Sequence, residues 1–208
     1  MGILGAIAGA LTTFFRPAFT LVQTIIKEAK PILQAVGHAL IEIGKALGII
    51  PETEEVDELG EKALQAEEKG DIKPGNYDSV EKYIDAVETF DKYDPEAKHP
   101  DEQRFAKGTE IAGALAVEKC PEVDMAKIFS IALLPGFMTI PGRFEEICKL
   151  VVNNPTAANA IGAFFSGNAK DVNTVNIAKD SLIAIEKQNN PVLTDIEAWK
   201  NIVGFKKD

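Results

Sequence analysis

The hydrophobic and polar positions of this chain recur at the spacing of α-helices along most of its length. In the clearest case, residues 32–47, apolar side chains occupy one face and polar side chains the opposite face. The apolar face holds Ile32, Val36, Leu40, Ile43 and Leu47, and the polar face holds Gln34, His38, Glu42 and Lys45. No stretch sustains the alternation of a β-strand, so the pattern predicts an all-α protein.

The same spacing predicts a series of helices after Pro51. Residues 52–70 are expected to form a solvated acidic helix with a thin apolar line. Residues 127–138, apolar on nearly every side, are expected to form the central core helix, which Pro135 ends. Further helices are expected over 78–93, 101–119, 141–153, 156–165, 171–188 and from 195 onward. Two of them begin with capping boxes, Asp78 with Glu81 and Thr194 with Glu197, and the last is expected to bury Trp199, Ile202 and Val203.

The first fifteen residues, MGILGAIAGALTTFF, carry no charged side chain. Wound as a helix, they place large apolar side chains on one side and small residues on another, and a second helix over 18–30 extends the apolar face. Small residues let helix backbones approach closely, as in membrane packing. The side chains expected to insert are Ile3, Leu4, Ile7, Leu11, Phe14, Phe15, Phe19, Val22 and Ile26, and the helix-packing residues are Gly2, Gly5 and Gly9.

Charge divides the chain unevenly around its net value of −10. Residues 1–50 are slightly cationic, and Arg16, Lys27, Lys30 and Lys45 are the candidates for contact with anionic headgroups. Residues 51–75 hold nine acidic residues against three lysines. We therefore expect three parts: an apolar cationic head over 1–50, an acidic connector over 51–75 and a helical bundle over 76–208. The acidic balance argues against nucleic acid as a partner.

Candidate chemistry is sparse. None of the common metal-binding, nucleotide-binding or nucleophile motifs occurs, and we expect no catalytic residue, metal or cofactor. His99 lies among acidic residues in DKYDPEAKHPDEQ, a segment without the glycine of an EF-hand, and is expected in a solvated interhelical loop. Cys120 and Cys148 are read as free, semi-buried thiols of a reducing compartment, with one disulfide bridge between them as the alternative. The acids of 52–71 are read as a solvated face, with pairing to the cationic head as the alternative.

The front of the chain also bears on localisation. No basic residue precedes the apolar run, as a secretory signal would require, and Ala6 stands where N-myristoylation prefers Ser or Thr. The run is shorter than the roughly 20 residues of a spanning helix. We therefore expect synthesis in the cytoplasm without a signal peptide, followed by association with a membrane or a virion-like particle.

Met1-Gly2-Ile3-Leu4, with the apolar side continuing through Ile7 and Leu11, resembles the start of small membrane-lytic peptides of the phenol-soluble modulin and delta-haemolysin type. It is also similar to membrane-penetration segments of viral entry and phage tail proteins. Those peptides carry lysines early, whereas the first lysine here is Lys27. The resemblance covers the N-terminal segment alone and implies insertion into a membrane.

Two hypotheses follow. In the first, a non-enzymatic helical protein inserts its head into a membrane or an assembly, as a component or cargo of a phage or tail-like injection particle. In the second, a structural or scaffold protein buries the same head permanently in a homo- or hetero-oligomer. In both, the junction at Lys73-Pro74-Gly75 is expected to be protease-sensitive, and residues 76–208 are expected to fold alone.

Overall fold

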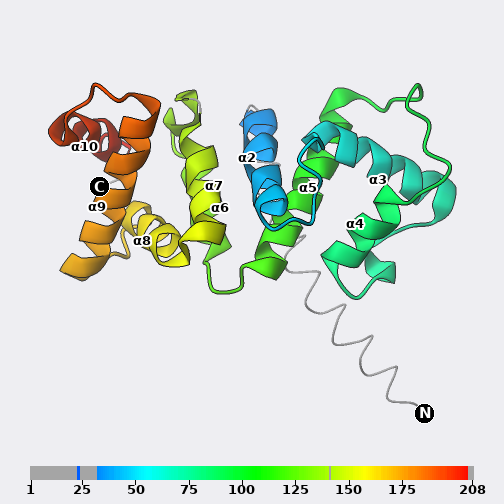
Figure 1. The fold of residues 1–208 in the computed structure, drawn as a ribbon, viewed down its shortest axis with the longest axis horizontal. Coiled ribbons are helices and arrows are strands. Elements are labelled where there is room, and N and C mark those ends of the chain that lie inside the picture. Colours follow the sequence, from blue (N-terminus) through cyan, green and yellow to red (C-terminus); the bar gives the residue numbers. More distant parts are fainter. Residues whose placement is uncertain (1–22, 24–31, 141, 206–208) are drawn as a thin grey trace, which may run out of the picture. The chain divides into compact units, whose positions relative to one another are not determined.

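The structure, a computed structural model, describes residue 23, residues 32–140 and residues 142–205 (Figure 1). Every element within these residues is a helix, and no strand occurs among them, which confirms the all-α prediction. The chain forms two compact units, Met1–Lys119 and Cys120–Asp208, called unit 1 and unit 2 below. This division differs from the expected one, because unit 1 draws helices from all three of the predicted segments.

Unit 1 is organised around a long central helix. Its described helices are α2 (Leu33–Ala46), α3 (Val56–Gly70), the 3-10 turn η2 (Pro74–Asn76), α4 (Val80–Glu88) and α5 (Asp101–Lys119). Helices α2, α3 and α4 all pack on α5, whose Ile111, Ala112 and Leu115 are fully buried. The predicted apolar face of 32–47 is confirmed at Val36, Leu40 and Ile43, which are buried. Residues 33–46 therefore belong to the core of unit 1.

Helices α3 and α5 approach so closely that only glycine fits where they cross. A β-carbon on Gly60 would lie 1.9 Å from the Arg104 carbonyl oxygen, and one on Gly108 would lie 1.7 Å from the Val56 carbonyl oxygen. Both distances are far inside van der Waals contact, and the obstacle is backbone in each case. The crossing therefore depends on the absence of a side chain at these two positions.

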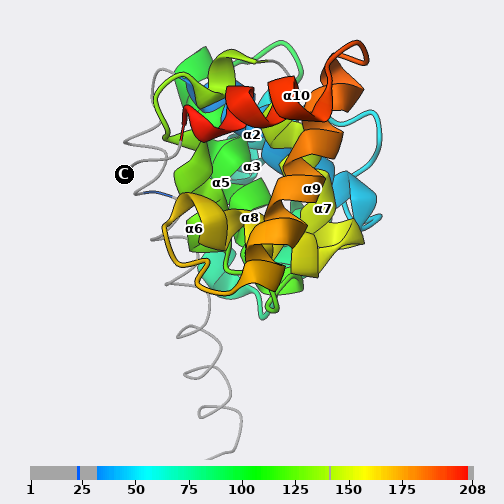
Figure 2. The same cartoon turned by 90° about the vertical axis from the view of Figure 1, so that its left-hand side faces the viewer.

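Unit 2 consists of α6 (Met125–Ala132), the 3-10 turn η3 (Phe137–Thr139), α7 (Arg143–Asn153), α8 (Pro155–Phe165), α9 (Val172–Asn189) and α10 (Asp195–Val203). Helix α8 packs against α6, α7 and α9, and α10 crosses the end of α9 (Figure 2). Aromatic rings meet edge to face in the core, Phe137 with Phe165 and Phe164 with Phe165. The core therefore relies on large side chains more than on close backbone approach.

Several predicted boundaries need correction. The capping residue of α4 is Ser79, whose Oγ accepts from the Lys82 amide, whereas Asp78 pairs with the Lys82 ammonium. Helix α4 ends at Glu88 instead of Tyr93. Helix α6 spans Met125–Ala132 instead of 127–138, because Pro135 lacks an amide hydrogen and disfavours helical backbone before it. Val203 is exposed on α10, not buried.

Other local predictions are confirmed. Helix α5 has the predicted bounds, 101–119. Thr194 and Glu197 form the predicted capping box of α10, in which each side chain bonds to the backbone of the other residue. The predicted apolar line of 52–70, Val56, Leu59, Ala63 and Ala66, is fully buried in α3.

Candidate functional site

The densest group of polar contacts in the described residues lies on α3. Glu61, Gln65 and Glu68 follow one another at helical spacing, so they project from one face of the helix. We call these three residues the polar seam. Glu61 and Gln65 are 1% exposed, although they lie in a helix predicted to be solvated. A buried carboxylate and a buried amide both require hydrogen-bonding partners.

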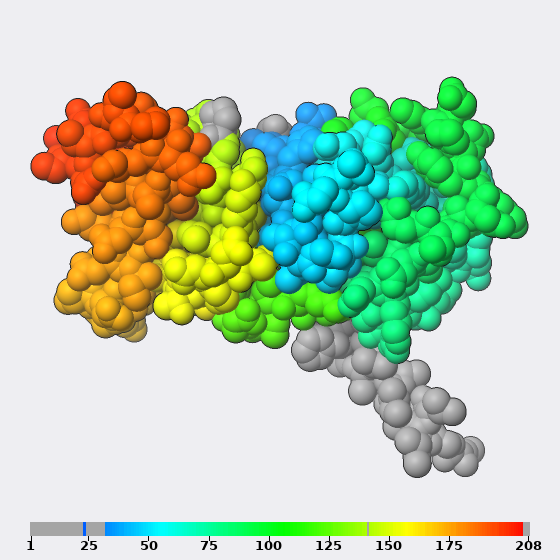
Figure 3. Space-filling model, viewed as in Figure 1, coloured from blue at the N-terminus to red at the C-terminus, as the bar shows by residue number. Residues whose placement is uncertain are grey.

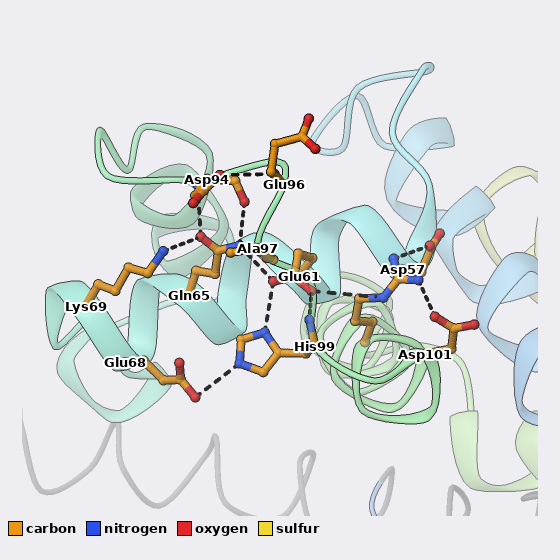
Figure 4. A network of polar contacts seen from close by, with 11 residues as sticks. Asp57, Glu61, Gln65, Glu68, Lys69, Asp94, Glu96, Ala97, His99 and Asp101 are labelled. Carbon is orange, nitrogen blue, oxygen red and sulfur yellow. Dashed lines mark hydrogen bonds and ion pairs between the residues drawn. The ribbon is translucent and has the colours of Figure 1, made fainter.

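The partners come from residues 91–100, the larger part of the segment between α4 and α5, which we call the strap (Figure 4). The Gln65 amide nitrogen donates to the Asp94 and Ala97 carbonyl oxygens at 2.8 and 2.7 Å. The Gln65 amide oxygen accepts from the Asp94 backbone amide at 2.9 Å and from Lys69 at 2.8 Å. One buried side chain thus satisfies three backbone groups of a segment that has no regular structure of its own.

His99 completes the attachment of the strap. Its backbone amide donates to Glu61 Oε2 at 2.8 Å, and its ring nitrogens face two carboxylates. Nδ1 lies 2.9 Å from Glu61 Oε1, and Nε2 lies 3.1 Å from Glu68 Oε1 (Figure 4). The hydrogen bond to Glu61 raises the pKa of His99 against the opposing effect of burial. The expected solvated loop is therefore a docked segment, and its histidine has two carboxylate partners.

Glu61 stays ionised although it is buried. Burial alone would raise its pKa, but hydrogen bonds from Gln65 and His99 outweigh that effect and lower the pKa of Glu61. Arg104 of α5 adds positive charge, with its Nε 4.0 Å from Glu61 Oε2. The two terminal nitrogens of Arg104 bind Asp57 at 2.7 Å and Asp101 at 2.6 Å. The seam therefore joins α3, the strap and the start of α5.

A second buried group in unit 1 joins the start and middle of α3 to α4. The Lys62 ammonium donates to Glu54 at 2.6 Å and to Glu88 at 2.8 Å. One oxygen of each glutamate is buried without a hydrogen-bond partner. Burial raises the pKa of Glu54, whereas the two carboxylates raise the pKa of Lys62 against its own burial. Among the described residues, one connector acid, Glu55, pairs with the predicted head, through His38 at 3.6 Å.

The main buried ion pair of unit 2 links α7 to α9. Arg143 is 1% exposed, and its Nε donates to Glu186 Oε1 at 2.5 Å. The guanidinium carbon lies 5.0 Å from the Phe137 ring centroid and 4.8 Å from that of Phe205. Its two terminal nitrogens are buried without a hydrogen-bond partner, so the pair is only partly satisfied.

The histidine of the strap and the two cysteines are each engaged or buried. His99 has both ring nitrogens engaged, so it does not offer a free base to a substrate. Cys120 and Cys148 are buried and free, and burial raises the pKa of Cys120 to about 11 and also raises that of Cys148. The thiolate is the reactive form, and these pKa shifts disfavour it. In the described ranges, no group of three or more His, Cys, Asp or Glu side chains could hold a metal ion.

Most of the residues predicted to insert, pack or contact headgroups lie outside the described residues. They are Gly2, Ile3, Leu4, Gly5, Ile7, Gly9, Leu11, Phe14, Phe15, Arg16, Phe19, Val22, Ile26, Lys27 and Lys30. The exception is Lys45, whose side chain is 10% exposed with its ammonium 3.1 Å from Glu42. Little of Lys45 is therefore available to a headgroup in this conformation.

The sequence pattern did not indicate the burial of these polar residues: Glu54, Glu61, Gln65, Arg104, Thr109, Arg143 and Glu186. The sequence contains a partial indication of burial for one pair, because Gln65 lies one helical turn after Glu61, next to the apolar line of α3. The partners of Glu61 and Arg143 are distant in sequence: His99 is 38 residues from Glu61, and Glu186 is 43 residues from Arg143. No local pattern identifies such pairs.

Comparison with known proteins adds no functional assignment: no family model, curated protein or solved structure matches this chain.

Proposed function

We propose that this protein is a non-enzymatic carrier whose apolar N-terminal segment inserts into a membrane boundary or a protein assembly. The observation that carries the proposal is a run of fifteen uncharged residues in a chain with a net charge of −10. Apolar side chains would enter the acyl boundary while Arg16, Lys27 and Lys30 meet anionic headgroups. A phage or tail-like injection particle is the setting that this design suits.

The packing of unit 1 limits which residues of the N-terminal segment can insert. Because α2 is buried against α3 and α5, residues 33–46 cannot insert without unfolding unit 1. Gln23 donates a 2.6 Å hydrogen bond to Glu110 of α5, which ties this position to unit 1 as well. The proposed inserting element is therefore residues 1–22, shorter than the expected head of 1–50. Among the described helices, none has the length and apolarity needed to cross a membrane.

The Gln23–Glu110 hydrogen bond also supports the second candidate function, a scaffold whose apolar segment is buried against protein. In that case the segment would hold copies of this chain, or this chain and a partner, in a defined oligomer. The two functions share the same residues and differ in whether lipid or protein covers them.

A pair of single-lysine variants tests the proposal. On a helical wheel Leu11 lies on the apolar side and Thr13 on the opposite side, so Leu11→Lys and Thr13→Lys add the same charge at similar depth. The full chain is expected to release dye from anionic vesicles. Leu11→Lys should weaken this by about thirtyfold, since losing one buried leucine costs about 2 kcal/mol. Thr13→Lys should retain the release.

The outcomes separate the two functions. Vesicle release that is equal in both variants, or absent from the parent chain, contradicts membrane insertion. A defined oligomer that persists without detergent and is lost in Leu11→Lys but not in Thr13→Lys would instead establish the scaffold function. If neither release nor oligomer depends on Leu11, both functions are wrong.

A further inference from the structure

The strap, residues 91–100, is held in place without any buried side chain of its own. None of its ten residues is buried, and it lies on the surface of unit 1 (Figure 3). The hydrogen bonds that tie it to α3 all come from the polar seam, Glu61, Gln65 and Glu68. Within the strap only Tyr93 and His99 are half-buried and the other residues are exposed, so these polar contacts carry much of its attachment.

Of these contacts, the two made by the His99 ring depend on its protonation state. A neutral imidazole has one N–H group and one lone pair, whereas an imidazolium has two N–H groups. Both ring nitrogens of His99 face carboxylate oxygens, which only accept hydrogen bonds. Only the imidazolium form of His99 can therefore donate a hydrogen bond to both carboxylates. In the neutral form, one lone pair would face a carboxylate at about 3 Å and repel it.

We propose that His99 is a proton-controlled latch, which holds the strap on the polar seam when its ring is protonated and releases it when the ring is neutral. Release uncovers Glu61 and Gln65, which the docked strap shields. The latch lies wholly in unit 1 and is independent of how residues 1–22 act.

The lowered pKa of Glu61 keeps this carboxylate ionised over the range in which His99 titrates. Glu61 is held by Gln65 and faces Arg104 of α5, and Glu68 is 61% exposed to solvent. Asp57 and Asp101 are engaged with Arg104, and Lys69 with Gln65. Asp94, Glu96 and Lys98 lie on the strap itself. With Glu61 anionic, the proton on His99 is the variable group of this pair.

The direction of the pH effect follows from the direction in which the pKa of His99 is shifted. The pKa of His99 is raised in the docked state, so docking is complete below the ordinary histidine pKa of about 6.5. Docking is then lost as pH rises through the raised pKa. Between these two values, the ratio of docked to released strap changes by up to about tenfold per pH unit, because one proton is bound in one state only.

Nuclear magnetic resonance of the full chain tests the latch directly. The probes are the His99 ring resonances and the exchange of the Asp94 and His99 backbone amides, both of which donate to the seam. Exchange is measured from pH 6 to pH 9 and corrected for its intrinsic pH dependence. We expect His99 to titrate above 6.5, and protection of both amides to fall together with the ring titration.

Two matched variants make the test specific. Glu68→Gln removes one carboxylate partner at an exposed position, so the fold is retained while the His99 titration and strap release both move to lower pH. Glu96→Gln removes the same charge from the strap, and its exposed carboxylate does not contact His99 (Figure 4). It should leave both unchanged. Titration of His99 at or below 6.5, amide protection independent of pH, or equal shifts in both variants would overturn the proposal.

Discussion

Unit 1 buries two glutamates, a glutamine, an arginine and a threonine in or next to α3 and α5, whereas unit 2 buries one arginine–glutamate pair and brings several aromatic rings into contact. The tightest crossing of unit 1 is made by two glycines, and the core of unit 2 is filled by phenylalanines. All the large hydrophobic residues that are exposed in the described ranges, Val172, Val192, Ile196 and Val203, belong to unit 2. We therefore expect the stability of unit 1 to depend on the protonation of its buried groups and on the absence of side chains where α3 and α5 cross. The stability of unit 2 should depend on the volume of its core side chains and on its buried ion pair.

The largest effect is expected from cutting the chain inside unit 1. A fragment of residues 76–208 removes α2 and α3, against which α5 buries Ile111 and Leu115. Amides of α5 should lose their exchange protection in this fragment, whereas those of unit 2 keep it. A fragment of residues 120–208 is the control and should unfold cooperatively. Retained protection of α5 in the longer fragment would instead support the boundary near Gly75 that the sequence predicts.

Breaking the buried Arg143–Glu186 pair of unit 2 should lower the stability of unit 2 by nearly as much. Glu186→Leu leaves the Arg143 guanidinium buried without a counter-charge, which destabilises proteins by about 3–5 kcal/mol. The double variant Arg143→Met with Glu186→Leu also removes the two unsatisfied nitrogens, so its stability should return close to that of the parent. Urea unfolding of the parent chain, the two single variants and the double variant measures this coupling. A double variant as unstable as Glu186→Leu would show instead that the pair itself stabilises unit 2.

We expect a somewhat smaller loss of stability from a substitution where α3 and α5 cross in unit 1. Gly108→Ala places a β-carbon against the Val56 carbonyl, and overpacking of this kind costs about 1–3 kcal/mol or more. Gly75→Ala is the matched control, because a β-carbon there meets nothing within 4 Å. It should be neutral or slightly stabilising, since alanine restricts the unfolded chain. Similar urea midpoints for the two variants would mean that the helices separate without cost.

The smallest effect concerns pH. The pKa values of His99 and Glu54 are raised in unit 1, so the stability that each contributes is complete below its ordinary pKa, 6.5 for His99 and 4.5 for Glu54, and is lost as pH rises through the raised value. The stability of unit 1 should therefore fall as pH rises above about 6.5, the ordinary pKa of histidine. In unit 2 the shifted acids, such as Asp124 and Glu197, have lowered pKa values, so their contribution is lost only at acidic pH. Thermal unfolding at several pH values, monitored through the amide exchange of each unit, measures how the stability of each unit depends on pH. An equal dependence on pH in the two units would contradict this prediction.

The sequence by itself determined the fold class and most of the helices. The 3.6-residue period of apolar side chains placed α5 and the buried lines of α2 and α3 correctly, because those faces must be buried in any compact arrangement. Local hydrogen bonding likewise determined the capping box of Thr194 and Glu197, whose partners are three residues apart. The proposal that residues 1–22 insert also rests on the sequence and stays a prediction.

Only the tertiary structure decided where the chain divides and which polar residues are buried. The composition shift near Pro74 and Gly75 indicated a linker, yet α2 and α3 before it pack on α5 after it, and composition carries no information about such packing. The acids of α3 looked like a solvated face, because nothing local shows that His99 and the backbone of the strap return to cover Glu61 and Gln65. A helix face can bury a carboxylate only when distant groups supply hydrogen bonds and charge, and these partners come together only in the folded chain.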